Sequence, residues 1–368
     1  MTGRPTWLHA FATFGAGGAQ IRAVQLMAHI GPRVRHLVVA MDGNTDAKQQ
    51  LPAGLDVTYA PAPPKGSFLR TVQAQRAFLR SVRPDLVLTY NWGAIESAAA
   101  ARSLALPLVH HEDGFGPEEV ARRFRRRSWL RTLVLRGAEV IVPSMVLQGI
   151  ARREWRLRDD RVHLLVNGVD LQRFRPAGPS GRNAFVIGTV GGLRGEKDHA
   201  NLLQALARLP SRVTASIVGG GALAGALQQQ CQALGLAERV VFVGSVADTA
   251  PHYRTFDLFV LSSRTEQMPI SMLEAMASGL PVVTTDVGDV RAMLPAASAD
   301  CIVPKEDPAA LAAAIQRLLD DPARRAKLGS DNRAVVEQRY QAAPCLDRYV
   351  QLYDRTSARS AKAHQDRR

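Results

Sequence analysis

Two glutamates eight residues apart lie in the mostly apolar segment TEQMPISMLEAMASGLPVV (265–283). Glu266 and Glu274 could form a solvated face, act as a general acid and base, or hold a hydroxyl-rich ligand through bidentate hydrogen bonds. The apolar run before them predicts a strand, and Pro269 and Gly279 are typical of a helix's first turn and its end. We therefore expect Glu266 in a strand-to-helix loop and Glu274 about two turns into the helix.

A second group of residues in the segment GTVGGLRGEKDHANLLQAL (188–206) could bind phosphate. A predicted strand leads into a Gly-Gly turn, Arg194 and Lys197 follow, and a helix is expected to begin near Asp198. Flexible glycines and cations beside a helix start form a plausible phosphate cradle. The segment is not a Walker motif, because the Gly-Lys-Ser/Thr end is missing.

A third segment, TFGAGGAQIRAV (13–24), places a glycine-rich turn between the first expected strand and the first expected helix. Its spacing departs from the dinucleotide fingerprint G-x-G-x-x-G, although Asp42 lies where an acidic ribose partner would be expected. A nicotinamide site and a tight turn without any ligand both stay open on these residues.

Polar residues also gather in LVHHEDGFGPEE (108–119), again at the end of an expected strand. His110, His111, Glu112 and Asp113 could be metal ligands, general acid/base groups or a polar loop. We expect no metal, because no distant cluster completes the ligand set and no Asp-x-Asp occurs in the chain. A bound diphosphate would then be neutralised by protein cations.

Short apolar runs alternate with helical stretches along the whole chain, which is typical of parallel sheets covered on both faces. The first half contains the expected strands TWLHAFAT, RHLVVAM, LDVTYAP, PDLVLTY, LPLVHH, AEVIVPS and VHLLVN. The second half contains AFVIGTVG, VTASIVG, VVFVGS, DLFVLSS, LPVVTTD and CIVP. The fold class we predict is α/β, with two Rossmann-like, doubly wound domains facing across a cleft.

The domain boundary is expected where Gly, Pro and Arg cluster between strand signals, in NGVDLQRFRPAGPSGRN. We place an N-terminal domain at 1–172 and a C-terminal domain at 173–340. A C-terminal helix at 341–357 could return to the N-terminal domain. Residues 358–368 are expected to be a disordered basic tail.

The chain has 368 residues and carries 47 Lys+Arg against 33 Asp+Glu, a net charge of +14. Its partners are therefore expected to be anionic, which leaves nucleic acid, acidic lipid and phosphorylated small molecules open. Three scattered cysteines favour a reducing compartment, and the cytoplasm is the default expectation. No apolar run approaches the ~20 residues that span a bilayer, and we interpret the N-terminal apolar run as a strand rather than a secretory signal.

The segment ARRFRRRSWLRTLVLRGA (121–138) carries seven arginines and no acid. Contact with an anionic membrane surface is one interpretation; a solvated helix whose apolar end packs on the core is the other. We do not expect nucleic acid as a partner, because neither interleaved aromatics nor a known module is present. The candidate membrane contacts are Arg122, Arg123, Arg125, Arg126, Arg127 and Arg131.

From about residue 7 to about residue 340, these segments in this order resemble the GT-B fold retaining glycosyltransferases of family GT4. The most specific part is the Glu-x7-Glu stretch with EAMASGLPVV behind it. The motifs GGAQ, NGVDLQRF, GGLRGEK and GGGALAGALQQQCQALGLAERVVFVG also fall in the expected order. Such a resemblance implies a nucleotide-sugar donor held mainly by the C-terminal domain and a saccharide or lipid-linked saccharide acceptor.

The resemblance also implies a role for individual residues. Glu274 would bind the ribose hydroxyls, Glu266 would bind the transferred sugar, and His110 or His111 would lie near its anomeric carbon. Arg194 and Lys197 would neutralise the leaving diphosphate in place of a metal cofactor. The implied donor-binding residues are Gly17, Gly18, Arg194, Lys197, Glu266, Gln267, Met268, Pro269, Ile270 and Glu274, and the catalytic ones are His110, His111 and Glu266.

Three positions depart from the family pattern. Gln267 replaces the usual glycine after the first glutamate, Arg194 lies two residues after the position of Gly192 where the family has its cation, and Gln20 replaces the commoner glutamate. We predict a metal-independent retaining glycosyltransferase, a hexosyltransferase, that extends a cell-surface glycan or lipid-linked saccharide at the inner face of the plasma membrane. A sugar-nucleotide epimerase or hydrolase on the same fold and a non-catalytic polyanion-binding protein are the alternatives.

Overall fold

The computed structural model describes residues 4–15, 17–115, 119, 124–177 and 185–365. Contacts between Cα atoms divide the chain into two compact units. Unit 1 comprises residues 1–167 together with 343–368, and unit 2 comprises residues 168–342. The division falls after Asn167, slightly before the expected boundary at residue 172, and residues 343–368 belong with the N-terminal unit.

Unit 1 is built on a seven-stranded sheet in which every neighbouring pair of strands is parallel. The spatial order is β3-β2-β1-β4-β5-β6-β7, so the direction of winding reverses between β1 and β4. The strands are β1 (Thr6–Phe11), β2 (Arg35–Ala40), β3 (Val57–Tyr59), β4 (Leu86–Tyr90), β5 (Leu108–His111), β6 (Glu139–Val142) and β7 (Val162–Leu164).

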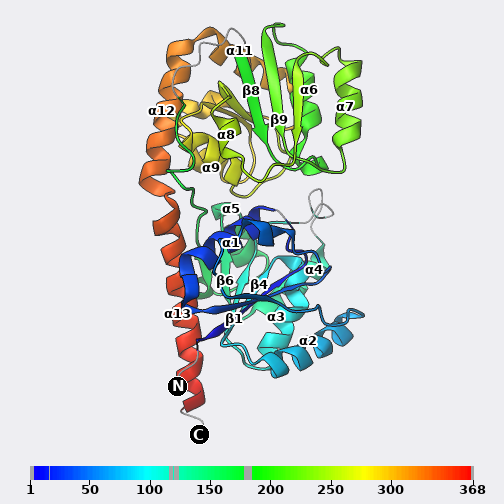
Figure 1. Cartoon of the computed structure of the whole chain (residues 1–368), viewed down its shortest axis with the longest axis vertical. Coiled ribbons are helices and arrows are strands. Elements are labelled where there is room, and N and C mark those ends of the chain that lie inside the picture. Colours follow the sequence, from blue (N-terminus) through cyan, green and yellow to red (C-terminus); the bar gives the residue numbers. More distant parts are fainter. Residues whose placement is uncertain (1–3, 16, 116–118, 120–123, 178–184, 366–368) are drawn as a thin grey trace. The chain divides into compact units, whose positions relative to one another are not determined.

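The helices of unit 1 cover both faces of this sheet (Figure 1). One face packs against α2, α3, α4 and α5 through a continuous apolar core. The other face packs against α1 and α13, where Trp7 of β1 meets Tyr353 of α13 edge to face. The helices are α1 (Gly18–Ile30), η1 (Gly31–Arg33), η2 (Asp46–Gln50), α2 (Phe68–Val82), η3 (Trp92–Ala94), α3 (Ile95–Ser103), α4 (Arg125–Leu135), α5 (Met145–Arg153), η5 (Asp159–Arg161) and α13 (Ala342–Gln365).

Unit 2 repeats the same plan with a six-stranded parallel sheet. Its order is β10-β9-β8-β11-β12-β13, so its winding reverses between β8 and β11. The strands are β8 (Phe185–Val190), β9 (Val213–Val218), β10 (Val240–Gly244), β11 (Leu258–Leu261), β12 (Val282–Thr285) and β13 (Ile302–Val303).

The core of unit 2 lies between its sheet and α6, α7, α11 and α12, whose leucines are buried. Alternate strand residues such as Ile187, Ala215 and Val260 face this core, as the period of a strand requires. The helices are η6 (Gly195–Lys197), α6 (His199–Leu206), α7 (Ala224–Ala233), α8 (Ala250–Tyr253), α9 (Ile270–Ala277), α10 (Val290–Met293), η7 (Ala296–Cys301), α11 (Pro308–Asp320) and α12 (Pro322–Arg339).

All thirteen strands expected from apolar runs are present, and the prediction of two Rossmann-like domains is confirmed. One terminal expectation is wrong. The helix α13 continues to Gln365, well into the segment that was expected to be disordered from residue 358. Alanine, serine and arginine in that segment tolerate a helix, so charge alone did not indicate its end.

The chain enters and leaves unit 2 at neighbouring points. The backbone N–H of Val169 donates to the carbonyl of Tyr340 at 2.8 Å, and the N–H of Ala342 donates to the carbonyl of Val169 at 3.0 Å. Val169 and Gln341 thus form an isolated parallel bridge. The first and last residues of unit 2 are therefore tied together.

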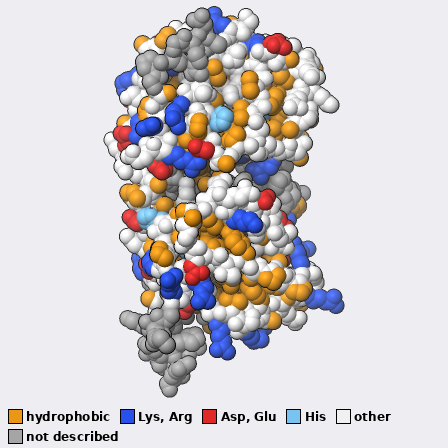
Figure 2. Space-filling view, viewed as in Figure 1, with side chains coloured by type: hydrophobic (Ala, Val, Ile, Leu, Met, Phe, Trp, Pro, Cys, Tyr) orange, Lys and Arg blue, Asp and Glu red, His pale blue; other side chains and the backbone are white. Residues whose placement is uncertain are grey.

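Within the described residues, we find no helix that combines the length and the apolar character needed to cross a membrane. Lysine and arginine side chains are spread over the visible faces of both units rather than collected in one stripe (Figure 2). The positive charge of the chain is thus distributed on that face.

Candidate active site

Two loops at the carboxyl edge of the unit 2 sheet bring sequence-predicted residues together. One follows β8 and carries Lys197, and the other, the β11–α9 loop (residues 262–269), carries Glu266. Since β8 and β11 are the neighbours between which the winding reverses, these loops flank the position where open α/β sheets bind ligands. Lys197 Nζ lies 2.5 Å from Glu266 Oε1, and the Ser263 hydroxyl donates to the same oxygen at 2.8 Å.

Arg194 lies on the same loop as Lys197 but is more exposed. Its guanidinium forms an ion pair with Glu196 at 3.0 Å, and 59% of its side chain is accessible to solvent. A Cβ atom built on Gly192 would lie 3.1 Å from Arg194 Nε. The guanidinium therefore occupies the space beside Gly192, the position at which the expected family pattern has its cation.

The turn after β12 packs against the backbone of the β11–α9 loop. Gly288 has a φ of +52°, and a Cβ atom there would lie 2.5 Å from the carbonyl oxygens of both Glu266 and Gln267. The Asp289 N–H donates to the carbonyl of Gln267 at 3.0 Å. Glycine is thus required at position 288 because the two backbones approach so closely.

The helix α9 begins immediately after Pro269, which occupies the N-cap position with extended backbone angles. Met268 and Pro269 are buried, whereas Gln267 and Ile270 are partly exposed. These four residues connect Glu266 to the helix that carries Glu274, as the sequence indicated.

Glu274 lies in the second turn of α9 and is partly buried. The Tyr253 hydroxyl donates to Glu274 Oε2 at 2.7 Å. Burial raises the pKa of Glu274 to about 7, although this hydrogen bond and the charge of Arg173 oppose the rise. The carboxyl group is therefore poised between its neutral and charged forms near neutral pH.

The glycine-rich loop of unit 1 lies at the end of β1. Gly17 is the N-cap residue of α1 and Gly18 is its first residue. The Gln20 amide donates to the carbonyl of Thr13 at 2.9 Å, and its Oε1 would lie 2.6 Å from a Cβ atom on Gly17. Gln20 thus folds back over the loop and lies against Gly17.

The two candidate histidines at the end of β5 are fully buried. His110 Nδ1 shares a hydrogen bond with the Thr89 hydroxyl at 2.8 Å, and His111 Nε2 shares one with the Tyr353 hydroxyl at 2.8 Å. Burial, followed by the charge of Arg22, holds the pKa of His111 well below its usual value. Both rings lie inside unit 1, so their contact with a reacting sugar stays a prediction.

A buried polar network surrounds His111 and contains residues that the sequence did not single out. Arg22 of α1 forms an ion pair with Asp113 and donates to Asn167 Oδ1 at 3.2 Å. Tyr353 reaches His111 from α13, more than two hundred residues away in sequence. Only the HHED run gave a signal for this network, because its other members come from three separate segments.

The arginine segment does not present all its charges to solvent. Arg131 is fully buried and donates to Glu112 Oε2 at 2.9 Å, and it also lies 3.5 Å from Glu119 Oε2. Arg127 pairs with Glu119 at 3.1 Å. The expectation that Arg131 contacts a membrane is therefore wrong, because two internal carboxylates hold its charge inside unit 1.

The remaining residues of that segment form an exposed surface on α4. Arg125 and Arg126 are exposed, and Trp129 and Leu133 follow on the same side with 64% and 58% of their surfaces accessible. Phe124, just before the helix, is also exposed. The predicted contacts Arg122 and Arg123 lie outside the described residues.

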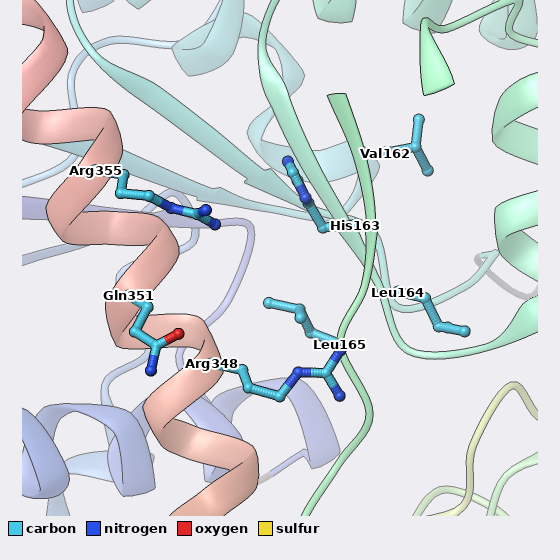
Figure 3. Close-up of a pocket in the computed structure, with 7 residues that line it drawn as sticks. All are labelled: Val162, His163, Leu164, Leu165, Arg348, Gln351 and Arg355. Carbon is cyan, nitrogen blue, oxygen red and sulfur yellow. The ribbon is translucent and has the colours of Figure 1, made fainter. Parts of the chain in front are cut away.

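Unit 1 also has an open groove between its edge strand β7 and α13. Arg348, Gln351 and Arg355 project from α13 toward the β7 segment (Figure 3). The strand side of the groove is formed by residues 162–165. None of the sequence-predicted site residues lines this groove.

Comparison with known proteins agrees with the two-unit architecture. The family model described as "Glycosyltransferase Family 4" matches residues 16–173, and that described as "Glycosyl transferases group 1" matches residues 184–321. The glycosyltransferase EpsF of Bacillus subtilis is 34% identical, but the match covers 34% of this chain and 36% of EpsF. D-inositol 3-phosphate glycosyltransferase 1 of Catenulispora acidiphila is 29% identical over 84% of both chains.

Among solved structures, Anabaena Alr3699/HepE in complex with UDP and glucose is 22% identical and has a TM-score of 0.82, covering 95% of this chain and 99% of that one. This likeness concerns the fold, which is shared across both units. Together, the family models cover most of both units. The chain belongs to the group 1 glycosyltransferases of family 4 and is a glycosyltransferase.

Proposed function

We propose that this glycosyltransferase moves a hexose from a nucleotide-sugar donor, without a metal and with retention of anomeric configuration, to a cell-surface glycan or lipid-linked saccharide. The observation that carries the proposal is the meeting of Lys197 with Glu266 at the switch point of unit 2, with Glu274 on the helix that follows. The related Anabaena protein is named in complex with UDP and glucose, which supports a nucleotide-sugar donor.

In this proposal, the diphosphate of the donor lies against Lys197 and Arg194. Lys197 now pairs with Glu266, so a bound diphosphate would share its ammonium group and leave Glu266 to accept hydrogen bonds from the sugar. Glu274 binds the ribose hydroxyls. Gln267 to Ile270 face the sugar through their backbone.

The chemical step separates charge between the sugar and the leaving diphosphate. Positive charge develops on the sugar ring, and negative charge develops on the phosphate oxygens. Fixed cations stabilise the second of these without reorganising, and one such group is worth about 3 kcal/mol in comparable sites. Lys197 is the best placed for this work because the β11–α9 loop already holds its ammonium group.

A thermal-shift panel with UDP-, GDP- and ADP-hexoses tests the donor, and an assay with and without EDTA tests the metal. We expect one nucleotide class to stabilise the protein and transfer to persist in EDTA. Glu266→Ala should abolish sugar transfer while the nucleoside diphosphate still binds. Full transferase activity in that variant with every donor would contradict the proposed site.

The same assay separates the proposal from its alternatives. Donor loss that is as fast without any acceptor as with one would indicate a hydrolase. The Catenulispora relative is named for D-inositol 3-phosphate, a small phosphorylated acceptor. Transfer to that compound but not to lipid-linked saccharides would replace our acceptor assignment and keep the transferase assignment.

We further propose that the exposed face of α4 contacts the anionic inner surface of the plasma membrane. Arginines at 125 and 126 would meet lipid phosphates, at about 1 kcal/mol each. Trp129 and Leu133 would enter the interface, where indole rings are favoured. Few other apolar side chains of this size are as exposed.

Flotation with vesicles containing phosphatidylglycerol tests this surface. Trp129→Ser should lower the bound fraction several-fold, because burying one large apolar side chain in the membrane interface contributes about 2 kcal/mol to the binding free energy. Leu69→Ser is a matched control, since Leu69 is 72% exposed but lies on α2. Equal binding by wild type and Trp129→Ser, or binding that ignores lipid charge, would refute the membrane contact.

A further inference from the structure

Tyr253, at the end of α8, is fully buried in unit 2 and points its hydroxyl at Glu274. The hydroxyl lies 2.7 Å from Glu274 Oε2 and 3.1 Å from the carbonyl of Ser271, one turn earlier on α9. No described group bonds Glu274 Oε1, and the side chain is partly exposed. One carboxylate oxygen is thus fixed by protein while the other is available to a ligand.

Aromatic rings hold Tyr253 in place. Phe174 meets it edge to face at a centroid distance of 5.6 Å, and Phe256 and Phe259 lie at 5.7 and 5.9 Å. Phe174 is the last residue of the NGVDLQRF motif. A motif that the sequence placed at the domain join therefore supports the tyrosine that contacts Glu274.

We infer that Tyr253 is a positioning residue for donor binding, which orients the Glu274 carboxylate toward the ribose hydroxyls while Phe174 keeps the tyrosine ring in place. The inference rests on the proposed function, because it assumes that Glu274 binds ribose. Tyr253 itself does not contact the ligand. Its effect should appear only when the ribose hydroxyls and the Glu274 carboxylate are both present.

The charges around Glu274 determine how this arrangement responds to pH. Tyr253 contacts it from α8, and the Arg173–Asp248 ion pair acts on it from the segments before β8 and α8. From α12, Arg333 donates to the carbonyl of Ala277 at the end of α9. Because the Tyr253 hydrogen bond favours the charged carboxylate, its loss should raise the pKa of Glu274 and shift the acid-side loss of ribose binding to higher pH.

Calorimetric titration of the full chain tests the inference. The probes are whichever of UDP, GDP and ADP binds wild type, and its 2′,3′-dideoxy analogue. Tyr253→Phe keeps the ring and should weaken the diphosphate about tenfold, the loss expected for a hydrogen bond to a charged group. It should leave the dideoxy analogue unchanged, and it should add nothing in a Glu274→Ala background.

Two further variants keep the test decisive. Tyr59→Phe is the matched control, since the Tyr59 hydroxyl is buried without a hydrogen-bond partner in unit 1 and its removal should not alter binding. Phe174→Leu leaves the hydroxyl but loosens its ring, and it should weaken binding in the same direction. If Tyr253→Phe does not fold, Phe174→Leu takes its place in the titrations.

Each outcome has a separate meaning. Unchanged binding and an unchanged pH profile in Tyr253→Phe would overturn the inference alone. An equal loss for both probes would show a general structural role and would also overturn it. Failure of all three diphosphates to bind wild type would contradict the proposed function, and the inference would fall with it.

Discussion

Replacing Arg131 by alanine should destabilise unit 1 without direct damage to the proposed donor residues of unit 2. Arg131 is fully buried, and its guanidinium lies 2.9 Å from Glu112 and 3.5 Å from Glu119. Its Cζ also lies within 5.0 Å of the ring centres of Trp92 and Trp155. Truncation would remove the charge and leave Glu112 buried, with His110 at 3.7 Å as its remaining ion-pair partner among the described residues.

The expected cost follows from that uncompensated carboxylate. Breaking a buried ion pair by removing one partner costs about 3–5 kcal/mol, and the remaining Arg127–Glu119 pair places this case near the lower end. Burial disfavours the charged form of Glu112, but Arg131 and His110 hold its pKa below the usual value. The stabilisation is therefore present above the unfolded pKa of about 4.3 and is lost as pH falls through the folded value.

In the variant, Glu112 should take up a proton at higher pH than in wild type. The difference in unfolding free energy should then be largest near pH 7 and shrink toward pH 5. Urea unfolding followed by tryptophan fluorescence measures it, because every tryptophan of the chain belongs to unit 1. These are Trp7, Trp92, Trp129 and Trp155.

Arg126→Ala is the matched control, since Arg126 is an exposed arginine of the same helix. It should change the unfolding free energy by less than about 0.5 kcal/mol and reduce vesicle binding instead. A loss below about 1 kcal/mol for Arg131→Ala, or a difference that does not change with pH, would refute the reasoning about a buried charge.

Three other perturbations test the site and the core. Gly288→Ala should displace the β11–α9 loop and weaken nucleotide-sugar binding in calorimetry. Gly225→Ala is the control and should not weaken binding, because a Cβ atom added there meets nothing within 4 Å. Equal binding by the two variants would contradict the close approach at Gly288. Lys197→Ala should lower kcat by about 10²–10³ if the ammonium stabilises the leaving diphosphate, and a kcat within twofold of wild type would exclude that role. Cys301 is buried and its pKa is raised to about 11 by burial, so it should react with a thiol reagent only after unfolding; fast labelling of the native chain would contradict this.

The sheets were predictable from sequence because their strands are buried on both faces and appear as short apolar runs. The loop positions of Lys197 and Glu266 followed from the same pattern, since residues after neighbouring parallel strands share one edge. Tyr253 was missed because its partner Glu274 lies 21 residues away on another helix, with no periodic spacing between them. A hydroxyl–carboxylate contact of this kind depends on packing.

The arginine segment shows a different limit. Adjacent arginines look alike in a sequence, but on a helix Arg126 and Arg131 face different surroundings. The carboxylates that draw Arg131 inward come from the β5 end and the segment after it, so no local pattern identifies them. The exposed Trp129 and Leu133 can be told apart from the buried side of α4 only when the packing of that helix on unit 1 is known.

The bridge between Val169 and Gln341 makes unit 2 an insertion whose two ends meet, rather than a sequential neighbour of unit 1. A segment with adjoining ends can be excised or exchanged while the flanking chain is rejoined over a short distance. Recombination at these two positions would transplant unit 2, which carries the proposed donor site, between relatives as one piece. Gene chimaeras joined there would change the unit that carries the proposed donor site and keep unit 1 unchanged.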